Sequence, residues 1–195
     1  MTRRIRAHYN ENIITVYQAY SSNIANPAVR AGKFVSPFKL ERMTWIKPSF
    51  LWMMYRSGWA SKPGQERVLA IEISRTGFEW ALEHSCLSSF DASYHKDHDS
   101  WHAQLTNSPV RLQWDPERDL NFRPLPTRSI QIGLAAEAVR RYNNDWIVQL
   151  SDITEKAHDI HSLSTQGRIS EALSALPEER EYPLTERLSN RINAG

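Results

Sequence analysis

The chain has 195 residues with one cysteine and a formal net charge of +2, and 41% of its residues are hydrophobic. This length and composition predict a single globular domain, with a core over about residues 5–150 and a helical extension over about 151–195. The lone Cys86 excludes an internal disulfide framework and favours a reducing compartment, the cytosol or, in a eukaryote, the cytosol and nucleus. No apolar segment reaches the roughly 20 residues that span a bilayer, so we expect no membrane partner.

Positive charge is concentrated in the N-terminal part of the sequence. Residues 1–62 contain only two acids, Glu11 and Glu41, against a much larger number of Lys and Arg. This asymmetry favours an anionic ligand on that part of the molecule. The alternative is that unrelated surface cations happen to fall there.

The hydrophobic pattern predicts the elements of the N-terminal half. Ile13–Tyr20 is rich in β-branched and aromatic residues and predicts a strand, and "NIANPAVRAG" predicts a helix that stops at Gly32. "RMTWIK" predicts a second, short strand. Pro48 suits the first turn of a helix through "PSFLWMMYRSG", which Gly58 closes. Arg67–Ser74, "RVLAIEIS", predicts the clearest strand of the chain, and the helix "GFEWALEHS" follows it.

The C-terminal half is less regular. Residues 85–109 predict irregular structure or a short helix, and "VRLQW" and "SIQIGL" predict two strands. "AAEAVRRYNN" predicts a helix, "DWIVQLSDIT" either a strand or a helix start, and the next 22 residues two helical pieces broken near Gly167. The charged tail after Pro177 is expected along the surface. Because strands and helices do not alternate strictly, we expect an α+β fold with a largely antiparallel sheet flanked by helices.

The block "RMTWIKPSFLWMMYRSGW", residues 42–59, combines cations with three of the seven Trp residues. At its turn "KPSF", a helix N-terminus leaves backbone N–H groups unpaired and makes an anion site. Lys47 and Ser49 lie beside this turn, and Arg42 would add a bidentate phosphate contact. The block therefore predicts a basic, aromatic-lined pocket for a phosphate-bearing ligand. The alternative is a buried strand–helix unit in which Ser49 is only a cap and the cations reach outward.

A second group of candidates lies in "YQAY", where the first predicted strand ends. The rings of Tyr17 and Tyr20 would stack on a base or a nicotinamide, and Gln18 would contact a polar edge. Arg6, upstream in "IRAHY", would pair with phosphate. The alternative is a Tyr-rich strand that only builds the core.

Glu66 lies in the loop "SGWASKPGQER", just before the clearest strand. Loops on a rigid scaffold often carry function, so Glu66 is a candidate general base or a ligand of a ribose hydroxyl. The alternative is a polar turn without a catalytic role.

The histidines of "HKDHDSWH" have spacing that resembles a metal site, since His98 and His102 would share a helix face with His95 nearby. The H-E-x-x-H arrangement is missing, so surface histidines are favoured and no metal is expected. The sequence also lacks G-x-G-x-x-G, a P-loop, G-x-S-x-G and C-x-x-C.

The run "VYQAY…RMTWIKPSFLWMMYRSGW…QERVLAI", with "RSIQIGL" later, resembles the domain-of-unknown-function family numbered 4291 over about residues 5–182. That resemblance implies no activity. At the level of the fold, "ITVYQAYSSNIANPAVRAGKF" resembles the opening of ADP-ribosyltransferase-type domains, including the RNA 2'-phosphotransferases, which implies a split sheet and an NAD pocket. "RMTWIKPSF" and "RVLAIEIS" would be their second pocket strand and central strand. Tyr17, Gln18 and Ala19 replace the usual His or Arg, and Gln131 stands where a catalytic Glu is usual.

Two main functions are consistent with these observations. One is a nucleotide-handling enzyme that binds NAD or a related phosphate ligand and transfers an ADP-ribosyl or phosphoryl group in a reaction involving RNA, with Arg42, Lys47 and Glu66 as catalytic candidates. Its ligand-binding candidates are Arg6, Tyr17, Gln18, Tyr20, Thr44, Trp45, Ser49, Arg56 and Gln131. The other is a non-enzymatic module whose cations follow the backbone of RNA or single-stranded nucleic acid while its aromatic rings stack on bases. A scaffold whose aromatic block packs against a partner is a third alternative.

Overall fold

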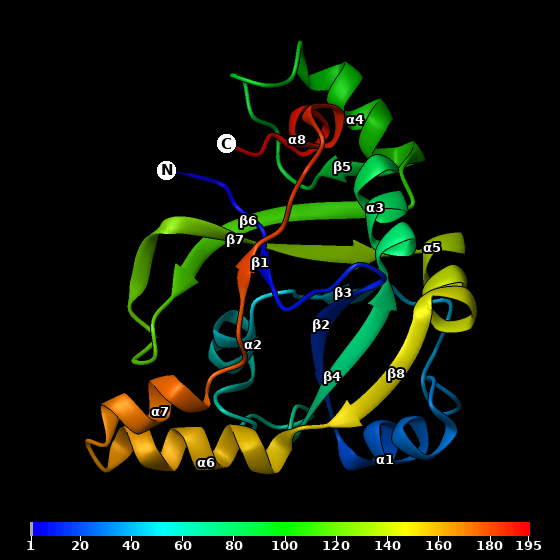
Figure 1. Cartoon of the computed structure of the whole chain (residues 1–195). Coiled ribbons are helices and arrows are strands. Elements are labelled where there is room, and N and C mark those ends of the chain that lie inside the picture. The colour runs from blue at the N-terminus through cyan, green and yellow to red at the C-terminus, as the bar shows by residue number, and fades with distance from the viewer. Residues whose placement is uncertain (1) are drawn as a thin grey trace.

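The strands of the computed structural model, which describes residues 2–195, gather in two main sheets with helices around them (Figure 1). In chain order the strands are β1 (Arg6–Ala7), β2 (Ile13–Tyr20), β3 (Thr44–Ile46), β4 (Arg67–Ser74), β5 (Ser85–Leu87), β6 (Val110–Arg118), β7 (Pro124–Leu134), β8 (Ile147–Asp152) and β9 (Arg180–Glu181). The helices are α1 (Ser22–Ala31), α2 (Phe50–Ser57), α3 (Arg75–Glu83), α4 (His98–Asn107), α5 (Glu137–Arg141), the π-helix η1 (Tyr142–Trp146), α6 (Thr154–Thr165), α7 (Ile169–Ala175) and α8 (Glu186–Ile192).

The first sheet has the order β2-β4-β8 and is antiparallel throughout. The second has the order β3-β7-β6-β5, with only β5 parallel to its neighbour. Tyr17 of β2 and Lys47 join the two sheets, since each backbone N–H donates to the other residue's carbonyl oxygen, at 2.7 and 3.2 Å. The end of β3 therefore lies where the two sheets meet.

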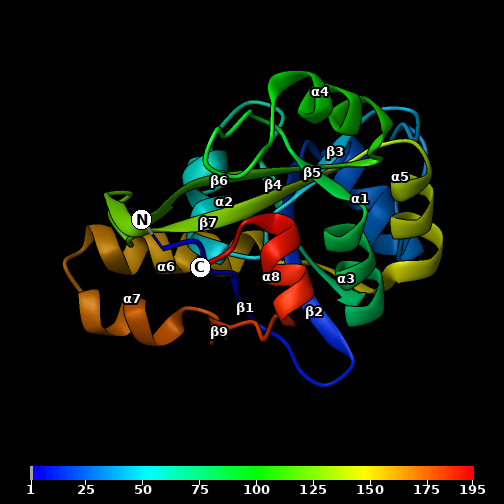
Figure 2. The same cartoon turned by 90° about the horizontal axis from the view of Figure 1, so that it is seen from above.

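The core lies between the inner faces of these sheets and the helices that cover them. Strand β4 is central in the first sheet, and its residues Leu69, Ile71 and Ile73 are fully buried. A second buried cluster lies under α2 and α6 and includes Phe50 and Ile160. Figure 2 shows α8 beside α3, so the last helix is part of the packed structure.

The α+β, largely antiparallel architecture expected from the sequence is confirmed. The charged tail lies along the surface, as expected, with most of its residues at least partly exposed. It is also anchored to the fold, because β9 pairs with β1 and α8 buries Leu188 and Ile192. The segment 85–109 contains β5 as well as the short helix α4. None of the helices among residues 2–195 is long and apolar enough to cross a membrane.

Candidate functional site

The turn from β3 into α2 is held in one conformation by its cap and by its packing. The Ser49 side chain accepts a hydrogen bond from the Trp52 N–H and forms the N-cap, so the helix begins at Phe50 rather than at Pro48. Gly58 ends the helix with φ of 60°. Phe50 is 1% exposed and Ser49 also 1%. A buried, capped helix start of this kind is a rigid support for a site.

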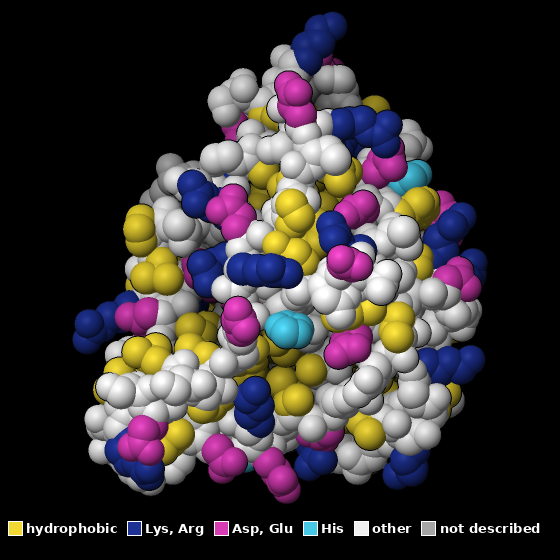
Figure 3. Space-filling model, viewed as in Figure 1, with side chains coloured by type: hydrophobic (Ala, Val, Ile, Leu, Met, Phe, Trp, Pro, Cys, Tyr) yellow, Lys and Arg dark blue, Asp and Glu magenta, His cyan; other side chains and the backbone are white. Residues whose placement is uncertain are grey.

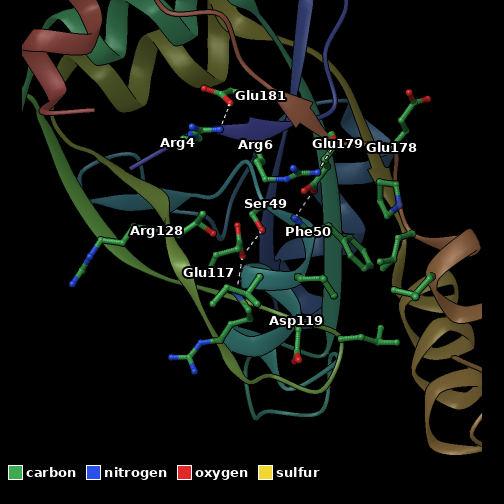
Figure 4. Close-up of a pocket in the computed structure, with 18 residues that line it drawn as sticks. Arg4, Arg6, Ser49, Phe50, Glu117, Asp119, Arg128, Glu178, Glu179 and Glu181 are labelled. Atoms are coloured by element: carbon green, nitrogen blue, oxygen red, sulfur yellow. Dashed lines mark hydrogen bonds and ion pairs between the residues drawn. The ribbon is translucent and has the colours of Figure 1, made fainter. Parts of the chain in front are cut away.

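The start of α2 binds carboxyl groups that the chain itself supplies (Figure 4). The Phe50 N–H donates to Glu179 Oε1 at 2.7 Å, and Ser49 Oγ donates to Glu117 Oε1 at 2.9 Å. The helix start therefore does attract acidic groups, as expected from the unpaired N–H groups and the helix dipole. Sequence reasoning missed both Glu117 and Glu179, because each reaches the turn from a distant part of the chain.

These groups line a cavity of about 580 Å³, called here the α2 cavity. Its wall is formed by the start of α2, the end of β6, the hairpin that joins β6 to β7, the end of α7 and the segment leading through β9. The lining residues are Arg4, Arg6, Ser49, Phe50, Leu51, Glu117, Arg118, Asp119, Leu120, Leu125, Thr127, Arg128, Leu173, Leu176, Pro177, Glu178, Glu179 and Glu181.

Burial dominates the electrostatics of the two inner acids. It raises the pKa of Glu179 to about 8, with the Phe50 N–H opposing the shift and the nearby Glu117 adding to it. Burial also raises the pKa of Glu117, against the hydrogen bonds from the Arg118 N–H, Ser49 and Ser129. Tyr17 lies close enough for Glu179 to help raise the pKa of its phenol, although burial is the larger cause. At neutral pH Glu179 therefore retains its proton.

The second sheet also carries a group of polar side chains. They lie on the face opposite to the one that packs in the main buried cluster. This polar sheet face is formed by Trp45 and Lys47 from the β3 side, Gln131 on β7, and Gln113 and Asp115 on β6. Gln131 Nε2 donates to Asp115 Oδ2 at 2.8 Å, and Gln113 Nε2 donates to Asp115 Oδ1 at 3.0 Å. The alternation of side chains along β3 thus separates an apolar face from a polar one.

Glycine at position 133 shapes this face. A Cβ atom there would lie 3.0 Å from the Trp45 ring, so the indole rests directly on the β7 backbone. Trp45 is the cross-strand partner of Gly133, which lies two residues after Gln131 on β7, so the three residues share one face of the sheet. The indole is thereby fixed beside Lys47.

Lys47 is the unusual member of the polar sheet face. It is 6% exposed, and among residues 2–195 its ammonium has no hydrogen bond or ion pair. Burial lowers the pKa of Lys47 to about 7; Arg56 on α2 adds to the shift and Asp115 opposes it. A buried ammonium is normally paired because leaving water is costly, and the lack of a direct partner is consistent with the lowered pKa of Lys47.

Gln18 lies at the centre of a buried hydrogen-bond network between β2 and β3. Its Nε2 donates to Thr44 Oγ1 at 2.6 Å and to the Tyr20 hydroxyl at 2.9 Å, and its Oε1 accepts from the Tyr142 hydroxyl at 2.7 Å. The amide is fully used, which makes Gln18 a residue that fixes the two strands relative to each other. Tyr20 and Thr44 also line a hollow of about 440 Å³ together with Lys39, Arg42 and Met43.

The candidate residues from the sequence thus fall into three neighbouring groups and one outlier. Arg42, Tyr20 and Thr44 are at the hollow, with Gln18 bonded to Thr44 behind it. Trp45, Lys47, Arg56 and Gln131 are at the polar sheet face. Arg6 and Ser49 line the α2 cavity, and Tyr17 lies near its Glu179. Glu66 is exposed, and its carboxylate accepts the Gly64 N–H within its own turn at 2.8 Å. The structure gives Glu66 no contact with the other candidates among the described residues.

The histidines of α4 and the preceding loop lie among aromatic rings. His98 and His102 are stacked with ring centroids 6.5 Å apart, and Trp101 lies between them and His95. Among residues 2–195 there is no group of three or more His, Cys, Asp or Glu side chains that could hold a metal ion.

The fold and these groups define an α+β protein that carries a polar sheet face with a nearly buried lysine and a separate cavity with two inner acids. The family described as "Domain of unknown function (DUF4291)" matches residues 4–182, and the chain belongs to this family. The matched range includes every candidate residue above, and Glu179 with them. Comparison with curated proteins gives no match.

Proposed function

We propose that the chain binds a nucleotide, NAD or a related phosphate-bearing molecule, along β3, with Lys47 as the central cation. The observation that supports this proposal is the Lys47 side chain, which is only 6% exposed, has no hydrogen bond or ion pair among the described residues and has Arg56 nearby. An unpaired buried cation is unfavourable unless a ligand supplies the opposite charge. A phosphate group supplies that charge and accepts hydrogen bonds from both Lys and Arg.

The groups on either side of Lys47 match the other parts of a nucleotide. The Trp45 indole, held against Gly133, offers a surface on which a base or nicotinamide ring stacks. Arg42 and Lys39 add positive charge at the hollow beyond Met43. The extended strand β3 leads from this hollow toward Lys47, so one elongated dinucleotide could contact both Arg42 and Lys47.

Transfer of an ADP-ribosyl or phosphoryl group is the reaction class that we assign to this site. A lysine whose pKa lies near 7 exchanges a proton readily at neutral pH, which suits it to general acid–base catalysis. If water is the acceptor, the bond between ribose and nicotinamide breaks, and NAD yields ADP-ribose and nicotinamide with release of one proton. Nicotinamide release is therefore the activity to measure.

The test is isothermal titration calorimetry with NAD, ADP-ribose, ATP and pyrophosphate on the wild type and on Lys47→Met. Met retains the apolar stem of Lys47 but lacks the charge. We expect saturation at one ligand per chain for the wild type and a loss of at least about tenfold in affinity for Lys47→Met, equivalent to about 1.4 kcal/mol. The matched control is Lys156→Met, which removes an exposed lysine from α6 and should leave affinity unchanged.

The alternative function is a non-enzymatic module that binds RNA or single-stranded nucleic acid. Binding of short RNAs, measured at two salt concentrations, distinguishes it from the nucleotide site. A nucleic-acid groove loses affinity steeply as salt rises, because each phosphate contact releases a counterion. A nucleotide pocket responds only mildly. Binding of RNA with a steep salt dependence, and no binding of the small nucleotides, would replace the proposed function with a nucleic-acid-binding one.

A further inference from the structure

The geometry points to a second ligand site: the α2 cavity binds an alkylammonium group, with the ammonium between Glu117 and Glu179 and the alkyl chain along a wall of leucines. This site is separate from the polar sheet face and does not depend on the nucleotide proposal.

Two carboxyl groups converge at the inner end of the cavity with only neutral donors as partners (Figure 4). Glu117 Oε1 accepts from Ser49 Oγ at 2.9 Å and from the Arg118 backbone N–H at 3.0 Å. Glu179 Oε1 accepts from the Phe50 N–H, and within the described residues its second oxygen accepts no hydrogen bond. Neither carboxyl has an ion pair there. Arg6 is the cation whose charge acts on both acids, but it forms no ion pair with either of them, so a bound ammonium would complete this acid pair.

None of the arginines that line the cavity forms an ion pair or a side-chain hydrogen bond with the carboxyl of Glu117 or Glu179 within the described residues. Arg4 pairs with Glu181 at 3.0 Å, and Arg128 donates to the Trp114 carbonyl oxygen at 2.8 Å. Arg6 donates to the backbone carbonyl of Glu179 at 2.8 Å, and not to its carboxyl. Arg118 stacks on the Tyr55 ring at 4.0 Å. The inner acids therefore keep their capacity for an added cation.

Much of the remaining cavity wall is apolar, and charged side chains such as Asp119 and Glu181 also line it. The apolar residues are Leu51, Leu120, Leu125, Leu173, Leu176 and Pro177. Leu125 on the hairpin is 37% exposed and Leu173 on α7 is 53% exposed. Figure 3 shows hydrophobic side chains on the surface over the hairpin and α7. Such a wall favours an alkyl chain over a hydrated metal ion, and the volume of about 580 Å³ is typical of a small-molecule site.

Binding of an ammonium displaces the proton of Glu179. The charged or titratable groups that face this carboxyl are Arg6 from β1, Tyr17 from β2 and Glu117 from β6. Because the ammonium interacts with the ionised acid, affinity for an alkylamine should rise with pH by up to roughly tenfold per unit below about pH 8 and level off above it.

The experiment measures binding of hexylamine, hexanol and hexanoate to the full chain by NMR titration at pH 6.5 and 8.5. We expect hexylamine to bind at one site and more tightly at the higher pH, with affinity rising by up to about fourfold for each methylene added from butylamine. Glu179→Gln retains the acceptor for the Phe50 N–H but not the charge, and should weaken binding at least about tenfold. Glu155→Gln, at an exposed position on α6 outside the cavity lining, is the matched control.

A second variant and a second ligand complete the test. Leu173→Gln changes only the exposed rim, so the protein should remain folded while the gain in affinity per methylene falls. A short peptide with one lysine between leucines is compared with hexylamine, and the tighter of the two identifies whether the ammonium comes from a protein side chain or from a free amine. Hexanoate or Mg²⁺ binding as well as hexylamine, or an unchanged affinity in Glu179→Gln, overturns the proposal.

Discussion

The Phe50 N–H donates to Glu179 Oε1 at 2.7 Å, so a residue near the C-terminus closes the start of a helix from the first third of the chain. β9 pairs with β1 immediately after Glu179 and holds that segment in place. The region after α7 therefore completes the α2 cavity. This agrees with the extent of the family match, which ends at residue 182.

The stability of the protein should fall as pH rises because of Glu179. Burial raises its pKa from 4.5 to about 8, so between these pH values the folded state holds a proton that the unfolded state has lost. This contribution is complete below pH 4.5 and is lost as pH rises through about 8, with a slope of at most about 1.4 kcal/mol per pH unit. Glu179→Gln removes this titration. In urea unfolding at pH 5, 7 and 9, the unfolding free energy of the variant relative to the wild type should therefore increase with pH, by a few kcal/mol in total, on the order of the integrated slope.

Glu178→Gln is the control for that measurement, because its exposed carboxyl lies one residue away. Its unfolding free energy should follow the wild type at every pH. If the unfolding free energies of Glu179→Gln and the wild type changed with pH in the same way, the prediction would be contradicted, because Glu179 would then have the same pKa in the folded and unfolded states.

Local patterns in the sequence predict most elements of this fold. The β-branched residues of Arg67–Ser74 form the central strand β4, and Ser49 and Gly58 mark the limits of α2 through side-chain capping and a left-handed backbone. Each of these signals acts within a few residues, which is why it is visible in one sequence. The charged tail gave no such signal, because its order comes from pairing with β1 and from the burial of α8 against α3.

The candidate site was predictable only in part, for the same physical reason. The basic block around Lys47 and the cap at Ser49 are local features. The burial of Lys47 is not local, because it depends on α2 folding back against β2 and β6 and bringing Arg56 near. Glu117 and Glu179 are separated from Ser49 by 68 residues and from Phe50 by 129 residues, respectively, so no spacing in the sequence connects them to the turn.

Tyr142→Phe should destabilise the protein by about 1–3 kcal/mol, since it leaves Gln18 Oε1 without its donor inside the core. Tyr142 is fully buried, so water cannot replace the lost hydroxyl without entering the core. The measurement is the midpoint of urea unfolding at constant m-value. Tyr55→Phe serves as the control, because among the described residues the Tyr55 hydroxyl makes no hydrogen bond; an equal loss in both variants would contradict the role of the network.

Gly77→Ala should be strongly destabilising, by about 1–3 kcal/mol or more, because an added Cβ would lie 2.3 Å from Trp146 Cγ. Helix α3 and η1 would have to separate to admit it. Combining Gly77→Ala with Trp146→Phe reduces the overlap, so the double variant should lose less stability than the sum of the two single variants. Strict additivity in thermal unfolding would contradict this close contact.

Lys47→Met should have the opposite pH dependence to Glu179→Gln, and it connects stability with binding. Burial lowers the pKa of Lys47 from 10.5 to about 7, so between these values the unfolded state holds a proton that the folded state lacks. The wild type is therefore less stable at low pH and gains stability as pH rises through this window. Met removes the unpaired charge, so Lys47→Met should be more stable than the wild type by a few kcal/mol near pH 6.5, on the order of the integrated slope, and the difference should vanish near pH 10.5.

The same substitution should weaken nucleotide binding, because the lost ammonium is the proposed partner of the phosphate. A residue that lowers stability and raises affinity is characteristic of a binding site, where function opposes optimal packing. Urea unfolding and calorimetry on the same preparations at pH 6.5 and 9 measure both effects. A Lys47→Met protein that is less stable than the wild type at pH 6.5 would mean that the ammonium is already satisfied within the fold, and the reason for placing a phosphate beside it would be lost.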